Sequence, residues 1–170
     1  MEKIAADWMS KRLVTVGADD PLSKCLELMR DNRIRHLPVL DRLGSVIGIL
    51  SDRDLQRALV RLGDEPEIIR DESTYEFKEG ETAQDYMSWP VETVSDDVPI
   101  QTVATRMLRT KVSALLVKNE RGHINGILTT DDLLKMLVNI LRRQPEGATA
   151  TLRSIESWIS ETHTETGAST

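Results

Sequence analysis

Cysteine is almost absent from this chain of 170 residues, and with Cys25 alone no internal disulfide can form. Aromatic residues make up only 4% of the sequence, so its core must be built mainly from aliphatic side chains. Histidine occurs three times, as His36, His123 and His163. Because His123 is expected in a turn and His163 in a polar tail, these residues can assemble neither a catalytic triad nor a metal cluster. The sequence therefore predicts a protein that is not an enzyme and holds no metal ion.

A long hydrophobic run is also missing. The most apolar stretch, residues 133–141, contains Lys135 and Asn139 and is far too short to cross a bilayer. The first residues lack the apolar core of a signal peptide. The 22 Lys and Arg against 28 Asp and Glu give a net charge of −6, without a dense basic stretch for nucleic acid. These absences predict a soluble cytoplasmic protein that binds neither membranes nor nucleic acid.

What the chain does contain is an internal repeat. Residues 7–55 align without a gap on residues 85–133, and 16 of the 49 aligned positions are identical. Unrelated segments of ordinary composition would share about 3. Each copy is expected to form one supersecondary module, and two copies suit a pseudo-twofold pair better than a solenoid. The predicted division is a first module at 1–62, an acidic linker at 63–82, a second module at 83–143 and a C-terminal region at 144–170.

Both copies predict the same order of elements. A short helical turn and a brief strand precede a helix, which Pro21 or Pro99 opens. Apolar residues at i, i+3, i+4 and i+7 predict one buried face on that helix, with Cys25 there as an inert thiol. Two strands around a glycine turn and a closing helix complete each copy. The expected ranges are 7–10 and 85–88 for the turns, 13–16 and 91–94 for the brief strands, and 36–40, 46–50, 114–118 and 124–128 for the paired strands.

Two segments lie outside the repeat. The acidic linker is expected to be solvated, with one short strand at 74–77. In the C-terminal region, helical spacing of the apolar residues at 152, 155, 158 and 159 predicts an amphipathic helix. This helix either docks on its own domain or is available to a partner. Residues 163–170 are polar and are expected to be disordered.

The closing helix of each copy begins with a short polar motif. Ser51 is followed three positions later by Asp54, and Thr129 likewise by Asp132. A hydroxyl at the N-cap and a carboxylate three residues on form a capping box, which satisfies unpaired N–H groups at the helix start. The same arrangement suits an anion at the helix N-terminus and an Asp that accepts from ribose hydroxyls. The motif alone leaves both interpretations open.

Taken together, these segments resemble the cystathionine-β-synthase (CBS) domain. The resemblance rests on Asp-x-Met-Ser, a Thr-Val strand, a Pro-led helix, residues 34–39 (Ile-Arg-His-Leu-Pro-Val) and Gly-x-x-Ser-x-x-Asp ending at Asp54. The second copy resembles another CBS domain, and the tandem is similar to a stand-alone Bateman module over about four fifths of the chain. The resemblance implies an α/β fold of two β-α-β-β-α units. It also implies two clefts that bind adenosine-containing ligands, and a homodimer.

The resemblance further implies roles for individual residues. Asp54 and Asp132 would contact ribose, and Ser51 and Thr129 would contact phosphate or ribose. The adenine pocket would be lined by Thr15, Val16, Ile34, Thr93, Val94 and Val112. The implied ligand is AMP, ADP or ATP, with NAD or S-adenosylmethionine as alternatives, and no cofactor is required. The implied function is regulation of a separate, unidentified effector protein; the alternative is a ligand-independent dimerisation scaffold.

The two copies differ just before their paired strands. Arg35 and His36 in the first copy correspond to Ser113 and Ala114 in the second. Arg and His can hold a phosphate by charge-assisted hydrogen bonds, whereas Ser offers one neutral bond and Ala none. We therefore expect phosphate affinity to depend more on the first copy. The alternative is that Arg35 belongs to a solvated edge and His36 packs as an ordinary strand residue.

Overall fold

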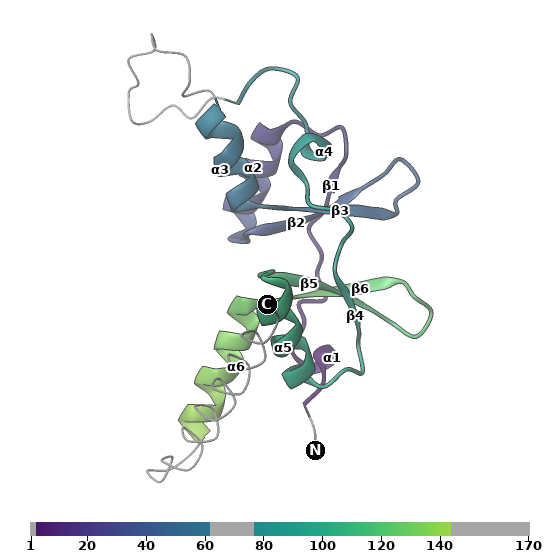
Figure 1. Ribbon diagram of the computed structural model, residues 1–170, viewed down its shortest axis with the longest axis vertical. Coiled ribbons are helices and arrows are strands. Elements are labelled where there is room, and N and C mark those ends of the chain that lie inside the picture. Colours follow the sequence, from purple (N-terminus) through teal and green to yellow (C-terminus); the bar gives the residue numbers. More distant parts are fainter. Residues whose placement is uncertain (1–2, 62–76, 144–170) are drawn as a thin grey trace, which may run out of the picture. The chain divides into compact units, whose positions relative to one another are not determined.

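The computed structural model describes residues 3–61 and 77–143 (Figure 1). The chain forms two units, Met1–Thr130 and Asp131–Thr170. The first unit contains both sheets and all described helices except most of the last one, α6 (Thr130–Arg143). None of the helices in the described ranges combines the length and apolar character that a membrane span requires.

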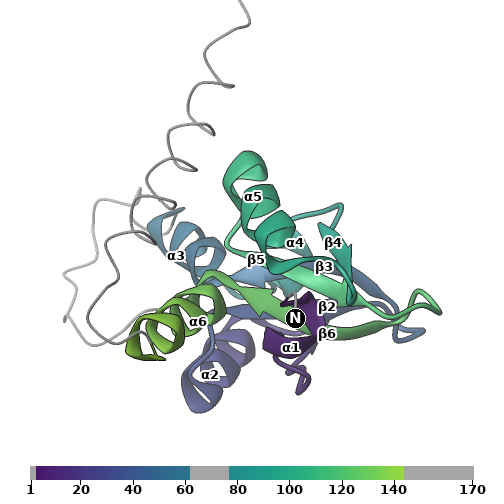
Figure 2. The same cartoon turned by 90° about the horizontal axis from the view of Figure 1, so that it is seen from below.

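Each repeat folds into a three-stranded sheet. The first has the order β1 (Val16–Gly17), β2 (His36–Leu40) and β3 (Val46–Ser51), with β1 parallel and β3 antiparallel to β2. The second repeats this order with β4 (Thr93–Ser95), β5 (Ala114–Lys118) and β6 (Ile124–Thr129). The predicted paired strands are confirmed, except that the closing strand of each hairpin is one residue longer. Both hairpin turns project on the same side of the unit (Figures 1 and 2).

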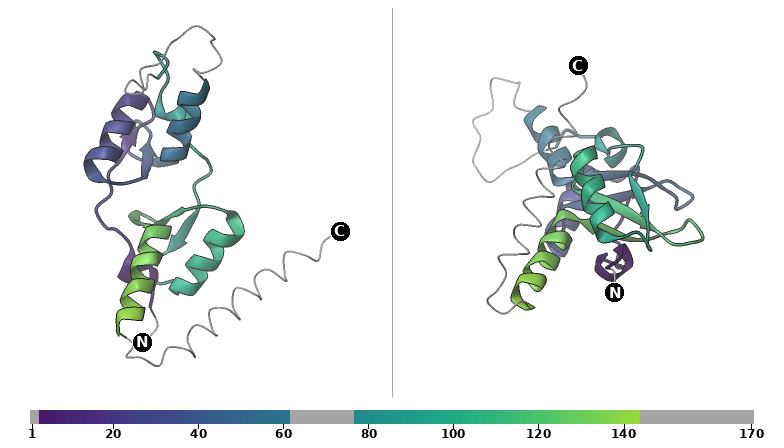
Figure 3. Two further views of the ribbon diagram at one scale, coloured as in Figure 1. Left: turned by 90° about the vertical axis from the view of Figure 1, so that its left-hand side faces the viewer. Right: turned by 60° about the horizontal axis from the view of Figure 1, so that its bottom comes forward.

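The helices predicted from apolar spacing are also present. α2 (Leu22–Asn32) buries Leu22, Cys25 and Met29, and α5 (Ile100–Thr110) buries the corresponding side chains of the second repeat. Pro21 and Pro99 were expected as the first helical residues, but they occupy the N-cap positions, one residue before each helix starts. α2 packs beside α3 (Asp52–Arg61) on the first sheet (Figure 3). The aliphatic core that results includes Leu37 and Leu50, paired across the hairpin and fully buried.

The brief strands begin later than the apolar pattern indicated. They were expected at 13–16 and 91–94, but the observed strands are β1 (Val16–Gly17) and β4 (Thr93–Ser95). In the first sheet the strand starts late because parallel pairing begins only where Val16 lies opposite Val39. Leu13 and Val91 instead pack against a cluster formed by Ala114, Leu116 and Ile127. Their apolar character therefore reflects burial between the two repeats and does not mark strand pairing.

The short helical turns are also displaced, by two residues toward the N-terminus. They are α1 (Ala5–Trp8) and α4 (Ala83–Tyr86), where 7–10 and 85–88 were predicted. The reason is that Asp85 belongs to a capping box: its Oδ2 accepts from the backbone N and the Oγ1 of Thr82, both at 2.8 Å. The aspartate of Asp-x-Met-Ser is thus the third helical residue of the turn.

Each short turn packs against the other repeat. Ser10 exchanges two backbone hydrogen bonds with Ile127 of the second repeat, at 2.8 and 3.1 Å. Ser88 does the same with Ile49 of the first repeat, at 3.1 and 2.9 Å. Beyond them, Met87 covers Gly48, where any Cβ would overlap its side chain. The repeats therefore exchange their first elements, and each sheet is completed by residues from the other copy.

The two segments outside the repeat can be compared with the prediction only in part. Of the strand expected at 74–77, residues 74–76 lie outside the described residues, and Phe77 lies in a loop against the first core. The amphipathic helix and polar tail expected beyond residue 143 also lie outside the described residues.

Candidate functional site

A cavity of about 820 Å³ lies between the two repeats at the start of α3. We call it the α3 cavity. Both repeats line it, and the segments that meet there are the starts of β2 and α3, the residue that ends α5, and the stretch before β4. The lining residues are His36, Ile49, Ser51, Arg53, Asp54, Gln56 and Arg57 from the first repeat, and Ser88, Pro90, Glu92, Lys111, Val112, Ser113 and Ala114 from the second.

The polar floor of the α3 cavity is the Ser51–Asp54 motif. The Oδ2 atom of Asp54 accepts from the Ser51 backbone N at 2.7 Å and from Ser51 Oγ at 2.6 Å. The backbone N of Asp54 lies 3.4 Å from Ser51 Oγ. The predicted capping box is thereby confirmed. The other carboxylate oxygen, Oδ1, accepts from the guanidinium of Arg57, so a ribose hydroxyl would have to share or replace that contact.

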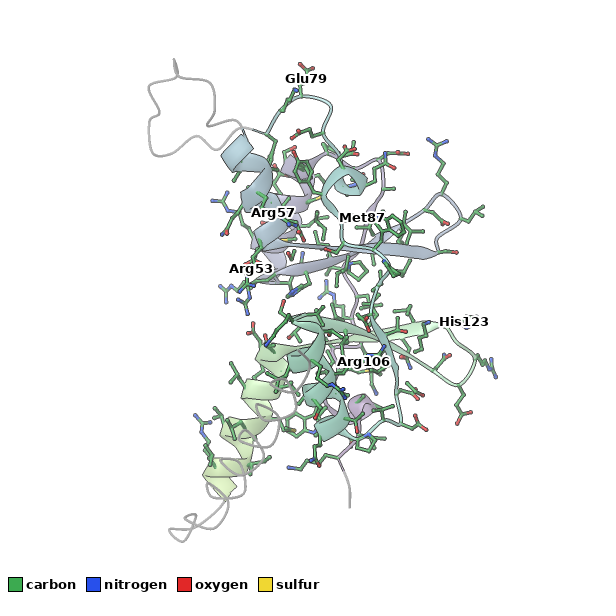
Figure 4. The ribbon with its side chains drawn as sticks, in the orientation of Figure 1. Arg53, Arg57, Glu79, Met87, Arg106 and His123 are labelled. Atoms are coloured by element: carbon green, nitrogen blue, oxygen red, sulfur yellow. The ribbon has the colours of Figure 1, made fainter. Side chains whose placement is uncertain are left out.

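Positive charge exceeds negative charge along the walls. Asp54 is paired with Arg57, and Glu92 is paired with Arg106 at 2.7 Å. Figure 4 labels the two arginines. Within residues 3–61 and 77–143, Arg53 and Lys111 make no side-chain hydrogen bond or ion pair, and both line the α3 cavity. Two cationic groups without a counter-ion in the described chain make the cavity favourable for an anion.

His36 and Ser113 meet across the α3 cavity. His36 Nε2 lies 2.8 Å from Ser113 Oγ, a distance suited to a hydrogen bond. His36 belongs to the first copy and Ser113 to the second, and the folded chain brings both to the wall of one cavity. Arg35 does not line this cavity: its carbonyl accepts from the backbone N of Asp52 at 3.0 Å, and its side chain is exposed. A phosphate contact for Arg35 therefore stays a prediction.

Of the residues implied for an adenine pocket, Val112 lines the α3 cavity. Ile34 is partly buried and packs against the first hydrophobic core. Val16 and Val94 are buried, with 2% and 6% of their surface exposed, and neither lines the α3 cavity. The alternation of a strand explains this placement, because Val16 and Val94 face inward toward the core of their own repeats.

The remaining implied residues lie elsewhere. Thr15 and Thr93 line a second cavity at the hairpin end of the sheets. Thr129 ends β6, and Asp132 lies in the first turn of α6, where its Oδ1 accepts from Lys135 Nζ at 3.2 Å. Both motif aspartates thus pair with a basic residue three positions later, Arg57 in the first copy and Lys135 in the second.

Sequence reasoning did not identify Arg53, Arg57 and Lys111 as site residues. A usable signal existed for the arginines, since both follow Ser51 on a helix that begins at Asp52. Lys111 gave no such signal. It ends α5 in the left-handed conformation with φ 59°, and only the folded chain brings it beside α3.

Metal binding and thiol chemistry have little support in the described residues. Residues 3–61 and 77–143 contain no cluster of three or more His, Cys, Asp or Glu side chains suited to a metal ion. Cys25 is fully buried, and burial raises the pKa of its thiol to about 11. A thiol with so high a pKa is almost entirely protonated near neutral pH, and it is a poor nucleophile.

Comparison with known proteins decides the family. The family model described as "CBS domain" matches twice, at residues 5–61 and 83–139. The chain belongs to the CBS-domain family. A CBS domain-containing protein of Dictyostelium discoideum is 32% identical over 146 residues, which cover 85% of this chain and 98% of that protein. The protein is thus a tandem CBS pair, and it is similar over 85% of its length to a relative that the match covers almost completely.

Solved CBS structures show the same fold. The CBS pair of protein MJ0100, in complex with 5′-methylthioadenosine and S-adenosyl-L-methionine, has a TM-score of 0.67 at 22% identity and covers 82% of this chain and 98% of that one. CBSX2 in complex with AMP has a TM-score of 0.62 at 25% identity, with 81% and 97% covered. The enzymes among similar sequences are matched over only 23% to 25% of their own length.

Proposed function

We propose that the protein is a regulatory module that binds an adenosine nucleotide in the α3 cavity. The observation that carries this proposal is the meeting of the Ser51–Asp54 motif with Arg53 and Lys111, two cations that lack counter-ions in the described chain. Ile49 and Val112 supply apolar walls for a base. The Asp54 carboxylate accepts hydrogen bonds from the ribose hydroxyls, and the cationic side chains hold phosphate by charge-assisted hydrogen bonds.

The charge of the cavity favours AMP, ADP or ATP over S-adenosylmethionine. Arg53, Arg57 and Lys111 line it, against the two carboxylates of Asp54 and Glu92, and each carboxylate is already paired. A phosphate is attracted by this excess of positive charge, whereas the sulfonium of S-adenosylmethionine is repelled. The related CBSX2 was solved with AMP, a ligand of the favoured kind.

Binding is coupled to regulation because the α3 cavity has walls from both repeats. A nucleotide that contacts His36 and Ser113 together stabilises one arrangement of the pair, and a separate effector protein recognises that arrangement. The protein acts without catalysis of its own. It works as a homodimer, in which the exposed apolar face of α6, formed by Leu134, Val138 and Leu141, packs against its copy.

A second function, a ligand-independent dimerisation scaffold, is favoured by one observation. Both carboxylate oxygens of Asp54 already have partners, Ser51 at Oδ2 and Arg57 at Oδ1. Such a carboxylate can serve as a helix cap with no ligand at all. Under this alternative the cavity would bind no nucleotide, and α6 would carry the whole function.

A thermal-shift screen separates the two functions. AMP, ADP, ATP, NAD, S-adenosylmethionine and adenosine are each added at increasing concentration to the full chain. A ligand at ~100 times its Kd adds roughly 2.7 kcal/mol of apparent stability. We expect AMP, ADP or ATP to raise the Tm more than adenosine, and S-adenosylmethionine to raise it least. If none of the six compounds raises the Tm, the scaffold function is favoured.

A further inference from the structure

A second cavity, of about 740 Å³, lies at the hairpin end of the two sheets. We call it the hairpin cavity. Equivalent positions of the two repeats line it, including Thr15 with Thr93 and Gly44 with Gly122. Among their lining residues the two cavities share Pro90 alone. In Figure 4, His123 marks the hairpin end of the unit, and Arg53 and Arg57 mark the opposite end.

Most of the hairpin cavity is apolar. Its walls include the side chains of Leu13, Leu40, Val46, Val91, Leu116 and Ile124. Trp89 also lines it and keeps 75% of its surface exposed. Its volume lies within the range of small-molecule pockets, roughly 300–1,000 Å³, which are typically apolar with a few polar groups placed at one side.

The polar groups of the hairpin cavity break the symmetry of the repeat. Lys118 and His123 line it on the second repeat, where the first repeat has Leu40 and Ser45. No carboxylate is among the lining residues. Within residues 3–61 and 77–143, the Lys118 ammonium makes no hydrogen bond or ion pair. One side of a mostly apolar cavity thus carries a cation that lacks a counter-ion in the described chain.

We propose that the hairpin cavity binds a small organic carboxylate with an apolar body. The Lys118 ammonium pairs with the carboxylate, and the His123 ring lies on the same repeat as a second polar contact. The aliphatic walls and the exposed Trp89 ring take up the apolar part. Since no lining carboxylate can hold a ribose, a nucleotide is not the favoured occupant. The two cavities therefore bind different classes of ligand at the same time.

Calorimetric titration with 1-naphthoate tests this proposal, and 1-naphthalenemethanol serves as its uncharged counterpart. We expect the full chain to bind naphthoate, with and without saturating AMP, at least tenfold more tightly than the alcohol. Lys118→Met should weaken naphthoate binding roughly tenfold or more, whereas Lys118→Arg should retain most of it. The matched control is Lys111→Met, which removes a cation from the α3 cavity and should leave naphthoate binding unchanged.

Four results would each overturn the proposal: no naphthoate binding, equal affinity for acid and alcohol, competition between naphthoate and AMP, or an unchanged affinity in a folded Lys118→Met variant. Circular dichroism and the Tm establish that the variants are folded. AMP titrations into the same proteins keep the two proposals apart. Naphthoate binding without AMP binding would count against the nucleotide function alone, and AMP binding without naphthoate binding would count against the hairpin cavity alone.

Discussion

His36 Nε2 lies 2.8 Å from Ser113 Oγ, and this hydrogen bond joins the first repeat to the second at the wall of the α3 cavity. The two residues do not occupy equivalent positions of the repeat, because His36 aligns with Ala114 and Ser113 aligns with Arg35. The contact therefore depends on how the two copies pack. The free energy of this contact therefore reports on the coupling between the repeats at the proposed binding site.

A double-mutant cycle on His36→Ala and Ser113→Ala measures this coupling. A partly buried hydrogen bond of this kind contributes about 0.5–1.5 kcal/mol to the free energy of unfolding. We expect the two substitutions together to cost less than the sum of their separate effects by about that amount, in urea unfolding. Strictly additive effects would mean that the contact contributes nothing to stability.

Gly48→Ala should destabilise the protein by about 1–3 kcal/mol, because the added Cβ overlaps the Met87 side chain that covers it. Gly17→Ala is a matched control, since its Cβ would meet Asp20 at an ordinary 3.6 Å. We expect the cost of Gly48→Ala to fall when Met87 is also replaced by Ala. A cost that is the same with and without Met87 would contradict the exchange of first elements between the repeats.

Cys25 makes stability depend on pH above 9. Burial raises the pKa of the thiol to about 11 from its ordinary 9.0, so the folded state holds the proton more tightly than the unfolded state. This contribution is fully present below pH 9 and is lost as pH rises toward 11, at up to about 2–3 kcal/mol. The difference in unfolding free energy between wild type and Cys25→Ala should therefore shrink from pH 8 to pH 11. A constant difference would contradict the raised pKa.

Leu134→Asp should convert the proposed homodimer into monomers. Leu134 is 59% exposed on α6, and with Val138 and Leu141 it forms an apolar face. A buried carboxylate without a partner in the dimer would cost several kcal/mol. Sedimentation velocity at about 50 μM measures the change, a concentration well above ordinary homodimer constants. Leu43→Asp, at an exposed hairpin-turn residue, is the control and should leave the assembly unchanged. A wild-type protein that is already monomeric would contradict this interface.

Local patterns predicted the hairpins and the longer helices well. Two short apolar segments on either side of the turn at Gly44 gave the paired strands, and apolar spacing gave α2, because each of these patterns is local in the sequence. The first elements were displaced for two reasons. Thr82 and Asp85 form a local capping box that the sequence analysis overlooked, whereas Ser88 pairs with Ile49 of the other repeat, a contact that one copy alone does not reveal.

The candidate site was predicted in part. The hydrogen bonds between Ser51 and Asp54 are local to one helix start, and the sequence pattern was sufficient to find them. Lys111 reaches the α3 cavity only through the pairing of the two repeats, which the alignment of copies does not reveal. The same pairing brings His36 of the first copy beside Ser113 of the second.

Calorimetric titration of AMP and adenosine into wild type, Lys111→Gln and Asp54→Asn tests the proposed function most directly. Lys111→Gln removes a phosphate contact, so AMP affinity should fall roughly ten- to a hundredfold while adenosine affinity hardly changes. Asp54→Asn retains a capping side chain but removes the charge that accepts from ribose, and it should weaken both ligands. Arg121→Gln, at an exposed hairpin residue outside the α3 cavity, should weaken neither. Unchanged AMP affinity in both cavity variants would contradict nucleotide binding in the α3 cavity.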